Sequence, residues 1–146
     1  MSKPIYILNG PNLNLLGRRE PDVYGAVTLD AIARACADRA AEYGADISFH
    51  QTNNEGELVD LIHEAGENGM GIIINAGAYT HTSVALLDAL KAVDLPAIEV
   101  HLSNIFQRED FRHHSYISPA ALGMITGLGA LGYELAVEAL IRHVED

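Results

Sequence analysis

The sequence of 146 residues predicts a single α/β domain in three layers, with a parallel sheet of five strands between two layers of helices. Two observations support this prediction. Short apolar runs alternate along the chain with longer amphipathic segments that have helical periodicity. No linker, repeat or low-complexity tract interrupts the alternation, so we expect one domain spanning residues 1–146.

Five segments have the patterns of β-strands. Residues 5–8, 70–74 and 97–100 are continuous or nearly continuous apolar runs, as expected of strands buried on both faces of a parallel sheet. Residues 45–52 alternate apolar and polar side chains, which is typical of an edge strand. A short run around residues 124–126 is expected to form the fifth strand.

Two helices are expected between the first three strands. The first spans residues 29–43, because Thr28 is a good N-terminal cap and Gly44 a good stop. Cys36 follows the apolar spacing of this helix, so we expect the cysteine in the core. The second helix ends before Gly69 and carries apolar residues at helical spacing. These residues are Leu58, Leu61, Ile62 and Ala65.

Two further helices complete the pattern. Ser83 or Thr82 can cap a helix over residues 84–93. A long loop is expected over residues 102–119, and the last helix runs to about residue 144. One side of the last helix carries Tyr133, Ala136, Val137, Leu140 and Val144, and another side carries Leu131, Leu135 and Ala139. Such a wide apolar surface usually means two buried sides, so we expect a homo-oligomer.

The alternation of strands and helices also predicts where a ligand binds. Right-handed crossovers favour the strand order 2-1-3-4-5, as in flavodoxin-like folds. Ligands bind such sheets at the carboxyl ends of the strands, where the strand order reverses, here between the first and third strands. Three polar loops emerge at this edge, over residues 9–25, 75–83 and 99–112.

The charge balance restricts the class of partner. The formal net charge is -11, which argues against nucleic acid, because a polyanion requires basic patches. Four of the nine Lys and Arg residues nevertheless lie in two of the three loops. These four are Arg18, Arg19, Arg108 and Arg112. Scarce positive charge concentrated in this way suggests a small anionic ligand.

Other features indicate a cytoplasmic protein that does not enter a membrane. Hydrophobic residues make up 49% of the chain, but no apolar run approaches 18 residues. No signal peptide is visible at the start of the sequence. Cys36 is the single cysteine, which excludes an intramolecular disulfide and fits a reducing compartment.

The loop after the first strand places a tyrosine near arginines. Tyr24 lies within seven residues of Arg18 and Arg19. Fixed cations beside a tyrosine favour its phenolate, because opposite charge stabilises the ionised form. The loop therefore predicts a tyrosine base, with a solvated surface loop as the alternative.

The other two loops add an acid and polar binding groups. Glu99 and His101 are separated by one residue, so on a strand both point to the same face. A carboxylate beside an imidazole orients it and favours its protonated form, which suits a general acid. The alternative is an ordinary ion pair at a strand end. No metal site is predicted, because the pair His113-His114 has no second ligand pair at metal spacing.

The sequence resembles the type II 3-dehydroquinate dehydratases, also called type II dehydroquinases, along essentially its whole length. Six separated motifs carry the resemblance in order. They are residues 8–17 (LNGPNLNLLG), 19–21 with 23–25 (REP, VYG), 75–78 (NAGA), 81–83 (HTS), 99–104 (EVHLSN) and 111–116 (FRHHSY). One departure is Phe106, where the family often has a histidine; it affects details of the loop around Arg108.

The resemblance implies a single catalytic domain that dehydrates 3-dehydroquinate to 3-dehydroshikimate in the shikimate or quinate pathway, without a cofactor. By this resemblance, Tyr24 removes a proton from the carbon alpha to the ketone. Arg19, with Arg108 nearby, holds the phenolate. His101 protonates the departing hydroxyl, with Glu99 behind it.

The resemblance also implies the binding groups and the assembly. Asn12 stabilises the enolate, in the manner of an oxyanion hole. The groups that bind the substrate's hydroxyls and carboxylate are Asn75, His81, Arg112 and the backbone of Leu102 and Ser103. Asp88 reaches the site of a neighbouring subunit, in a dodecamer built from trimers.

Two other classes of protein share features of this sequence. Residues 127–132 match the G-x-G-x-x-G fingerprint of dinucleotide-binding enzymes, but the chain after them is too short for the strand and acidic residue that the fingerprint requires. Close packing of the last helix explains these glycines better. A flavodoxin-like ligand-binding or signalling module is the second alternative. A phospho-acceptor receiver needs carboxylates at the strand ends that Asn9 and Asn75 occupy.

Overall fold

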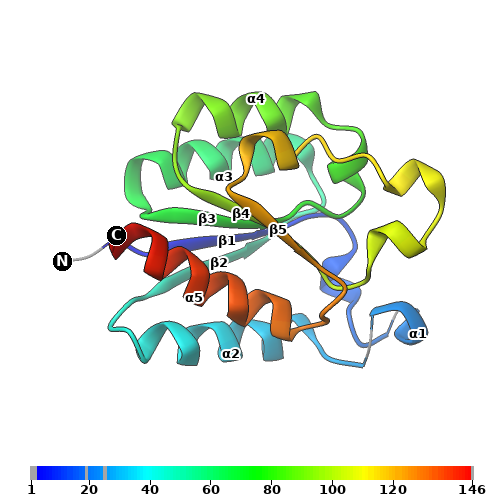
Figure 1. Cartoon of the computed structure of the whole chain (residues 1–146), viewed down its shortest axis with the longest axis horizontal. Helices are drawn as coiled ribbons and strands as arrows, with labels where there is room; N and C mark the ends of the chain where they lie inside the picture. Colours follow the sequence, from blue (N-terminus) through cyan, green and yellow to red (C-terminus); the bar gives the residue numbers. More distant parts are fainter. Residues whose placement is uncertain (1–2, 19, 25, 146) are drawn as a thin grey trace.

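The computed structural model describes residues 3–18, 20–24 and 26–145, and shows five parallel strands with helices on both faces (Figure 1). The strands are β1 (Ile5–Asn9), β2 (Ile47–Gln51), β3 (Gly71–Asn75), β4 (Ala97–His101) and β5 (Gly123–Thr126). Their order is β2-β1-β3-β4-β5, which confirms the predicted order and the three-layer α/β architecture.

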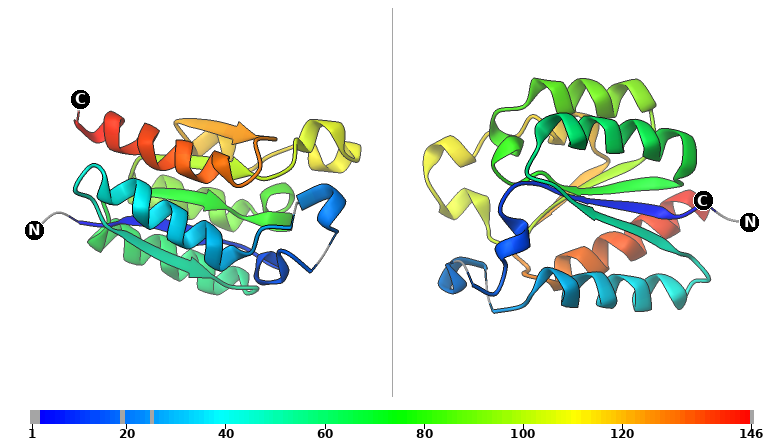
Figure 2. Two further views of the ribbon diagram at one scale, coloured as in Figure 1. Left: turned by 90° about the horizontal axis from the view of Figure 1, so that it is seen from below. Right: turned by 180° about the vertical axis from the view of Figure 1, so that it is seen from behind.

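The four longer helices divide evenly between the two faces of the sheet. They are the single turn α1 (Pro21–Tyr24), followed by α2 (Leu29–Ala41), α3 (Glu55–Asn68), α4 (Val84–Val93) and α5 (Leu131–Glu145). Helices α2 and α5 pack on one face and α3 and α4 on the other, as Figures 1 and 2 show. In the described part of the chain, no helix combines the length and the apolar character needed to span a membrane.

The helix starts follow the predicted caps. The side chain of Thr28 accepts a hydrogen bond from the Ala31 amide at 3.2 Å. Ser83, and not Thr82, caps α4, because its Oγ accepts from the Leu86 amide at 3.0 Å. Each bond satisfies an amide that has no partner inside the helix.

Helix α2 ends earlier than the predicted residue 43. Its last residue is Ala41, and the chain then tightens into a turn in which the Gly44 amide donates to the Ala41 carbonyl. The φ angle of Gly44 is 72°, in the left-handed region that glycine adopts without strain. The predicted stop residue is therefore correct, but the last residues before it belong to the turn.

The edge strand β2 does not alternate in burial as predicted. All five of its residues are half-buried, because the neighbouring elements only partly cover a strand at the margin of the sheet. Phe49 packs against the core between α2 and α5, while the ring of His50 stacks on Tyr6 at 5.5 Å between centroids. The edge position is confirmed, but both faces of this strand have neighbours.

The core is apolar, as predicted. Cys36 is fully buried in the layer between the sheet and helices α2 and α5. Burial raises the pKa of its thiol to about 12, so the cysteine stays an unreactive thiol at neutral pH.

Two glycines bring the loops after β1 and β3 together. In the sheet, Asn9 pairs with Asn75, so both strands end at the same level. A Cβ atom on Gly10 would lie 2.3 Å from the carbonyl oxygen of Ala76, a contact that only glycine avoids. Gly77 has a φ of 59° and lies against Pro11. The backbones of the two loops therefore touch, and the residues after them surround one edge of the sheet.

Candidate active site

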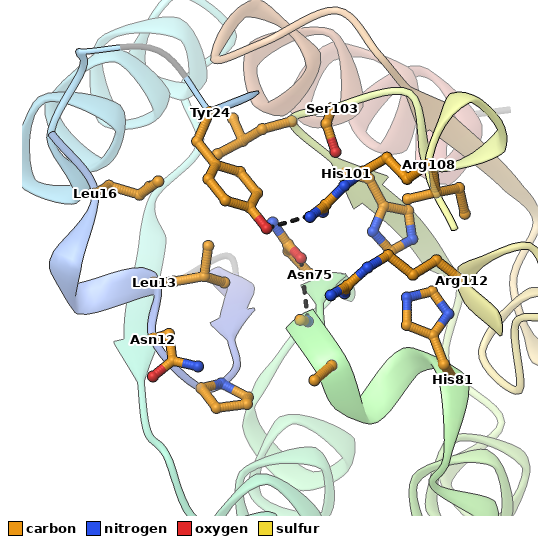
Figure 3. A pocket seen from close by; sticks show the side chains of 15 residues that line it. Asn12, Leu13, Leu16, Tyr24, Asn75, His81, His101, Ser103, Arg108 and Arg112 are labelled. Carbon is orange, nitrogen blue, oxygen red and sulfur yellow. Dashed lines mark hydrogen bonds between the residues drawn. The ribbon is translucent and has the colours of Figure 1, made fainter. Parts of the chain in front are cut away.

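A cavity of about 260 Å³ opens at the carboxyl ends of β1, β3 and β4 (Figure 3). This is the predicted position, next to the point where the strand order reverses. The size is close to the lower end of the range for small-molecule pockets, about 300 Å³. Its polar lining residues are Asn12, Tyr24, Asn75, His81, His101, Ser103, Arg108 and Arg112.

Tyr24 and Arg108 form a pair on one wall of the cavity. Nη1 of Arg108 donates a hydrogen bond to the Tyr24 hydroxyl at 2.9 Å, drawn as a dashed line in Figure 3. The guanidinium carbon lies 5.3 Å from the centre of the tyrosine ring. Both side chains are half-buried, so water weakens the attraction between the guanidinium and the phenol oxygen less than it would in bulk solvent.

The backbone of Arg108 is held by a histidine. Nε2 of His113 donates to the Arg108 carbonyl at 2.9 Å, because a carbonyl oxygen can only accept. The ring of His113 in turn lies against Phe106, with centroids 5.7 Å apart. Phe106, the departure from the family pattern, therefore contacts the histidine that holds the Arg108 backbone and does not line the cavity.

His101 and Glu99 form a second pair, at the end of β4. Both side chains lie on one face of the strand, as predicted, and His101 Nε2 donates to Glu99 Oε2 at 2.5 Å. Glu99 has no exposed surface and His101 is also buried. The bond fixes the orientation of the His101 ring and leaves Nδ1 as the ring nitrogen available to the cavity.

Two serines also donate hydrogen bonds to the Glu99 carboxylate. Ser115 Oγ donates to Oε2 at 2.8 Å and Ser118 Oγ donates to Oε1. Burial by itself raises the pKa of Glu99, but the hydrogen bonds from His101, Ser118 and Ser115 outweigh burial and hold the pKa below its usual range. Glu99 is therefore a charged carboxylate inside the protein.

The change Ser118→Ala should make the protein less stable to acid. A carboxylate whose pKa is lowered by folding stabilises the fold at neutral pH, and that stability is lost as the pH falls through the folded-state pKa. Without the Ser118 donor this pKa rises, so the acid-unfolding midpoint, measured by circular dichroism, should move to higher pH. The control is Ser48→Ala, whose hydroxyl bonds to His50 and not to a carboxylate. An unchanged midpoint for Ser118→Ala would contradict the role of this bond.

His81 lies beside His101, on the turn that follows β3. Its Nδ1 donates to the His114 carbonyl at 2.8 Å, and its ring stacks on His101 with centroids 6.4 Å apart. Burial lowers the pKa of His81, and the nearby positive charge of His101 and Arg112 lowers it further. His81 is therefore a neutral side chain whose Nε2 can accept a hydrogen bond.

Arg112 supplies a second guanidinium to the cavity. Its Nε donates to Glu109 at 3.0 Å, and its guanidinium carbon lies 5.0 Å from the ring centre of Phe111. Glu109 also lies 3.8 Å from Nε of Arg108, so one exposed carboxylate steadies both arginines. Two cations on one wall favour an anionic ligand.

Residues 3–141 of the chain match the family model described as dehydroquinase class II. The chain belongs to the class II dehydroquinase family. This confirms the family resemblance inferred from the six motifs.

Curated relatives match the class II dehydroquinase chain over almost its full length. It is 58% identical over 145 residues to a 3-dehydroquinate dehydratase 2 of Pseudomonas aeruginosa, covering 99% of this chain and 98% of the relative. It is 59% identical over 140 residues to a 3-dehydroquinate dehydratase of Dinoroseobacter shibae, covering 96% of this chain and 93% of the relative.

Solved structures share the fold of this dehydroquinase. The type II dehydroquinase of Butyrivibrio crossotus has a TM-score of 0.93 and 42% identity, covering 96% of this chain and 98% of that chain. The type II dehydroquinase of Propionibacterium acnes has a TM-score of 0.91 and 45% identity, covering 100% of this chain and 99% of that chain.

Most of the predicted site residues of the dehydroquinase line the same cavity. Asn12, on the loop after β1, has a φ of 71°, and its backbone amide donates to Asn53 Oδ1 at 3.0 Å. Leu102 and Ser103 line the wall after β4, where the Ser103 carbonyl accepts from Thr126 Oγ1 at 3.0 Å. Three predicted residues are not among those that line it. Glu99 lies behind His101 with no exposed surface. Arg19 lies outside the described residues, and Asp88 is exposed on α4 and does not line the cavity.

Several residues that support the site were not predicted. Ser115 is part of the motif at 111–116 but was given no role, and Ser118 is in no motif. Tyr133 was predicted as one of the apolar residues of the last helix, yet its hydroxyl lies between Asn9 and Asn75. The only sequence signal for Tyr133 is a hydroxyl on a helix face that is otherwise apolar.

Proposed function

We propose that this class II dehydroquinase converts 3-dehydroquinate to 3-dehydroshikimate and water, with Tyr24 as the base and His101 as the acid. The observation that carries the proposal is that Tyr24, Arg108 and His101 line one small cavity, with Glu99 bonded to His101 from behind. The two relatives that are 58% and 59% identical are 3-dehydroquinate dehydratases, which supports the same reaction.

The first step is removal of a proton from the carbon alpha to the ketone of the substrate. The Tyr24 phenolate takes the proton and the electron pair of the C–H bond forms an enolate. Arg108 makes this possible at neutral pH, because its guanidinium stabilises the negative charge on the phenol oxygen before the reaction. Arg19 is proposed as a second cation for the same oxygen.

The second step is loss of the hydroxyl beta to the ketone. The enolate electrons form the new carbon–carbon double bond as the C–O bond breaks, and the proton on Nδ1 of His101 goes to the departing oxygen, which leaves as water. Glu99 keeps the imidazolium ready for this transfer and fixes its ring through the bond to Nε2. Proton exchange with solvent then restores Tyr24 and His101.

Polar groups around the cavity bind the rest of the substrate. Asn12 is proposed to stabilise the enolate oxygen, as the donors of an oxyanion hole do. Arg112 and Asn75 are proposed as donors, and His81 as an acceptor, for the carboxylate and the hydroxyls of the substrate. The backbone of Leu102 and Ser103 forms the remaining wall of the cavity.

A lysine Schiff base is the rival chemistry for a dehydration beta to a ketone. The chain has two lysines, Lys3 and Lys91. Lys3 donates to the Glu67 carbonyl at the amino end of the sheet, and Lys91 is exposed in the last turn of α4. Neither lines the cavity, so the enolate route is proposed.

The binding-module alternative is not favoured by the family match. The dinucleotide motif is explained by packing. A Cβ atom on Gly127 would lie 2.9 Å from the Cβ of Asn104, and one on Gly132 would lie 3.2 Å from Ile125. These glycines allow β5 and α5 to approach their neighbours.

A homo-oligomer in the cytoplasm is proposed, built as a dodecamer of trimers in which Asp88 reaches a neighbouring cavity. The second apolar side of α5 supports association, because Leu131 is 49% exposed and Ala139 is also exposed in the single chain. Val144, predicted on the core side of this helix, is 44% exposed because it lies in the last turn, beyond the core residues Leu140 and Ile141.

The test of the proposed function is a turnover assay that follows the ultraviolet absorbance of the enone product. The purified protein should produce the enone from 3-dehydroquinate without any added cofactor. Quinate is the matched control, because it has no ketone, cannot form the enolate and should give no signal. A protein that leaves 3-dehydroquinate unchanged would refute the proposal.

Removing the cation beside the base should change the pH dependence. In Arg108→Ala, the proposed phenolate loses the guanidinium that donates to it, so kcat should fall and recover partly as the pH rises. Arg112→Ala is the control, because this arginine lines the same cavity but contacts Glu109 and not Tyr24. It should weaken substrate binding with no alkaline recovery. If Arg108→Ala also shows none, its role is positioning only.

A further inference from the structure

We propose that Tyr133 and Asn9, neither of which lines the cavity, are positioning residues that lock the Asn75 side chain with its NH₂ group as a donor to the ligand. The inference rests on the proposed function, because it assigns Asn75 a fixed polarity toward an anionic substrate. It follows from a chain of hydrogen bonds whose direction is determined at both ends.

The series of hydrogen bonds begins at a backbone carbonyl. Nδ2 of Asn9 donates to the His50 carbonyl at 3.0 Å. Because a carbonyl oxygen cannot donate, the Asn9 amide must present its NH₂ group on that side and its oxygen on the other. That oxygen accepts the hydroxyl hydrogen of Tyr133 at 2.6 Å.

The single hydrogen of Tyr133 is thereby used, so toward Asn75 its oxygen can only accept. Nδ2 of Asn75 donates to this oxygen at 2.9 Å. On its other side, Oδ1 of Asn75 accepts from the Gly77 amide at 3.2 Å, and an amide N–H can only donate. Both neighbours therefore require the same orientation of the Asn75 side chain.

Burial makes the reversed orientation costly. Asn9 and Tyr133 have no exposed surface, and Asn75 is 4% exposed. A flipped Asn75 amide would set an NH₂ group against the Gly77 N–H and leave two buried polar groups without partners, with little access to water. Burial also raises the pKa of Tyr133, so the phenol keeps the hydrogen that the chain requires.

The locked orientation has a consequence for the cavity, which Asn75 lines (Figure 3). One hydrogen of its NH₂ group is used on Tyr133, and the second is available to a ligand. Together with the guanidinium of Arg112, this donor suits the oxygens of a carboxylate. Tyr133 and Asn9 touch no ligand, so their effect on binding must pass through Asn75.

The test is a double-mutant cycle on the intact protein, with KM and kcat for 3-dehydroquinate as the readouts. Tyr133→Phe removes one oxygen and should raise KM by about 3- to 10-fold, the effect of one hydrogen bond, with kcat changed less than about twofold. In the Asn75→Ala background the same change should leave KM within about twofold, because the group that Tyr133 orients is gone.

A purely structural role predicts a different result. Tyr133→Phe would then lower the melting temperature but change KM by the same factor in both backgrounds, or not at all, and either outcome would overturn the proposal. Turnover by the unaltered protein distinguishes a failure of the proposed function from a failure of the locking role. If it does not turn over 3-dehydroquinate, the proposed function fails. If it does and the cycle is additive, only the locking role fails.

A second pair of variants decides the matter if Tyr133→Phe does not fold. Asn9→Asp keeps an acceptor for the Tyr133 hydroxyl and should leave KM within about twofold, even at some cost in stability. Asn9→Leu removes the acceptor, releases the Tyr133 hydrogen and should raise KM as Tyr133→Phe does. Equal KM values for these two variants would overturn the proposal.

Discussion

The change Tyr24→Phe should lower kcat by about 10²- to 10⁴-fold, the usual contribution of a general base. Phenylalanine keeps the ring that lies beside Arg108 and removes only the oxygen that accepts the proton. Substrate binding and the melting temperature should change little. KM, kcat and thermal unfolding of the purified variant measure all three.

The control for this variant is Tyr43→Phe. Tyr43 also uses its hydroxyl in one hydrogen bond, to Glu138 at 2.7 Å, but it is exposed and lies outside the cavity. Its turnover should equal that of the unaltered protein. A Tyr24→Phe variant that retains more than about a tenth of the activity would remove Tyr24 as the base, because general-base catalysis contributes more than this.

The change His101→Ala should also lower kcat by about 10²- to 10⁴-fold, because the departing hydroxyl then has no proton donor. Glu99→Gln should have a smaller effect. The amide still bonds to the imidazole but no longer stabilises its positive charge. The control is His143→Ala, an exposed histidine in the last turn of α5. Loss of less than about tenfold in His101→Ala would assign the acid role to another group.

The fold could be predicted because its signals are local. Continuous apolar runs predicted β1, β3 and β4, and the alternation of strands and helices favoured the strand order that the structure shows. The end of α2 was less predictable. Residues 42–44 are compatible with both a helix and a turn, and the bonds of the turn to Ala40 and Ala41 decide between them.

The reactive pairs of the site were predictable to different degrees. Glu99 and His101 lie two residues apart on one strand, so their spacing alone indicated contact. The partner of Tyr24 was harder to predict. Nearness in sequence pointed to Arg18 and Arg19. Arg108, 84 positions away in the chain, was expected nearby only from the family resemblance, and the structure shows that it donates to the phenol.

The supporting groups could not be predicted from spacing. Ser118 reaches Glu99 across 19 positions, and Tyr133 reaches Asn9 across 124. In the sequence, a serine in a loop and a tyrosine on an apolar helix carry no pattern that indicates a partner. Their roles arise from burial, since each meets a polar group that has lost its water.

Deuterium exchange tests the proposed division of labour between Tyr24 and His101 most directly. His101→Ala should still form the enolate but not eliminate, so 3-dehydroquinate recovered from deuterium oxide should carry deuterium at the carbon alpha to the ketone, above an enzyme-free control. The double variant with Tyr24→Phe and His101→Ala should show no more deuterium than that control. Nuclear magnetic resonance of the recovered substrate measures both. Equal deuterium incorporation with and without the Tyr24 hydroxyl would contradict the role of Tyr24 as the base.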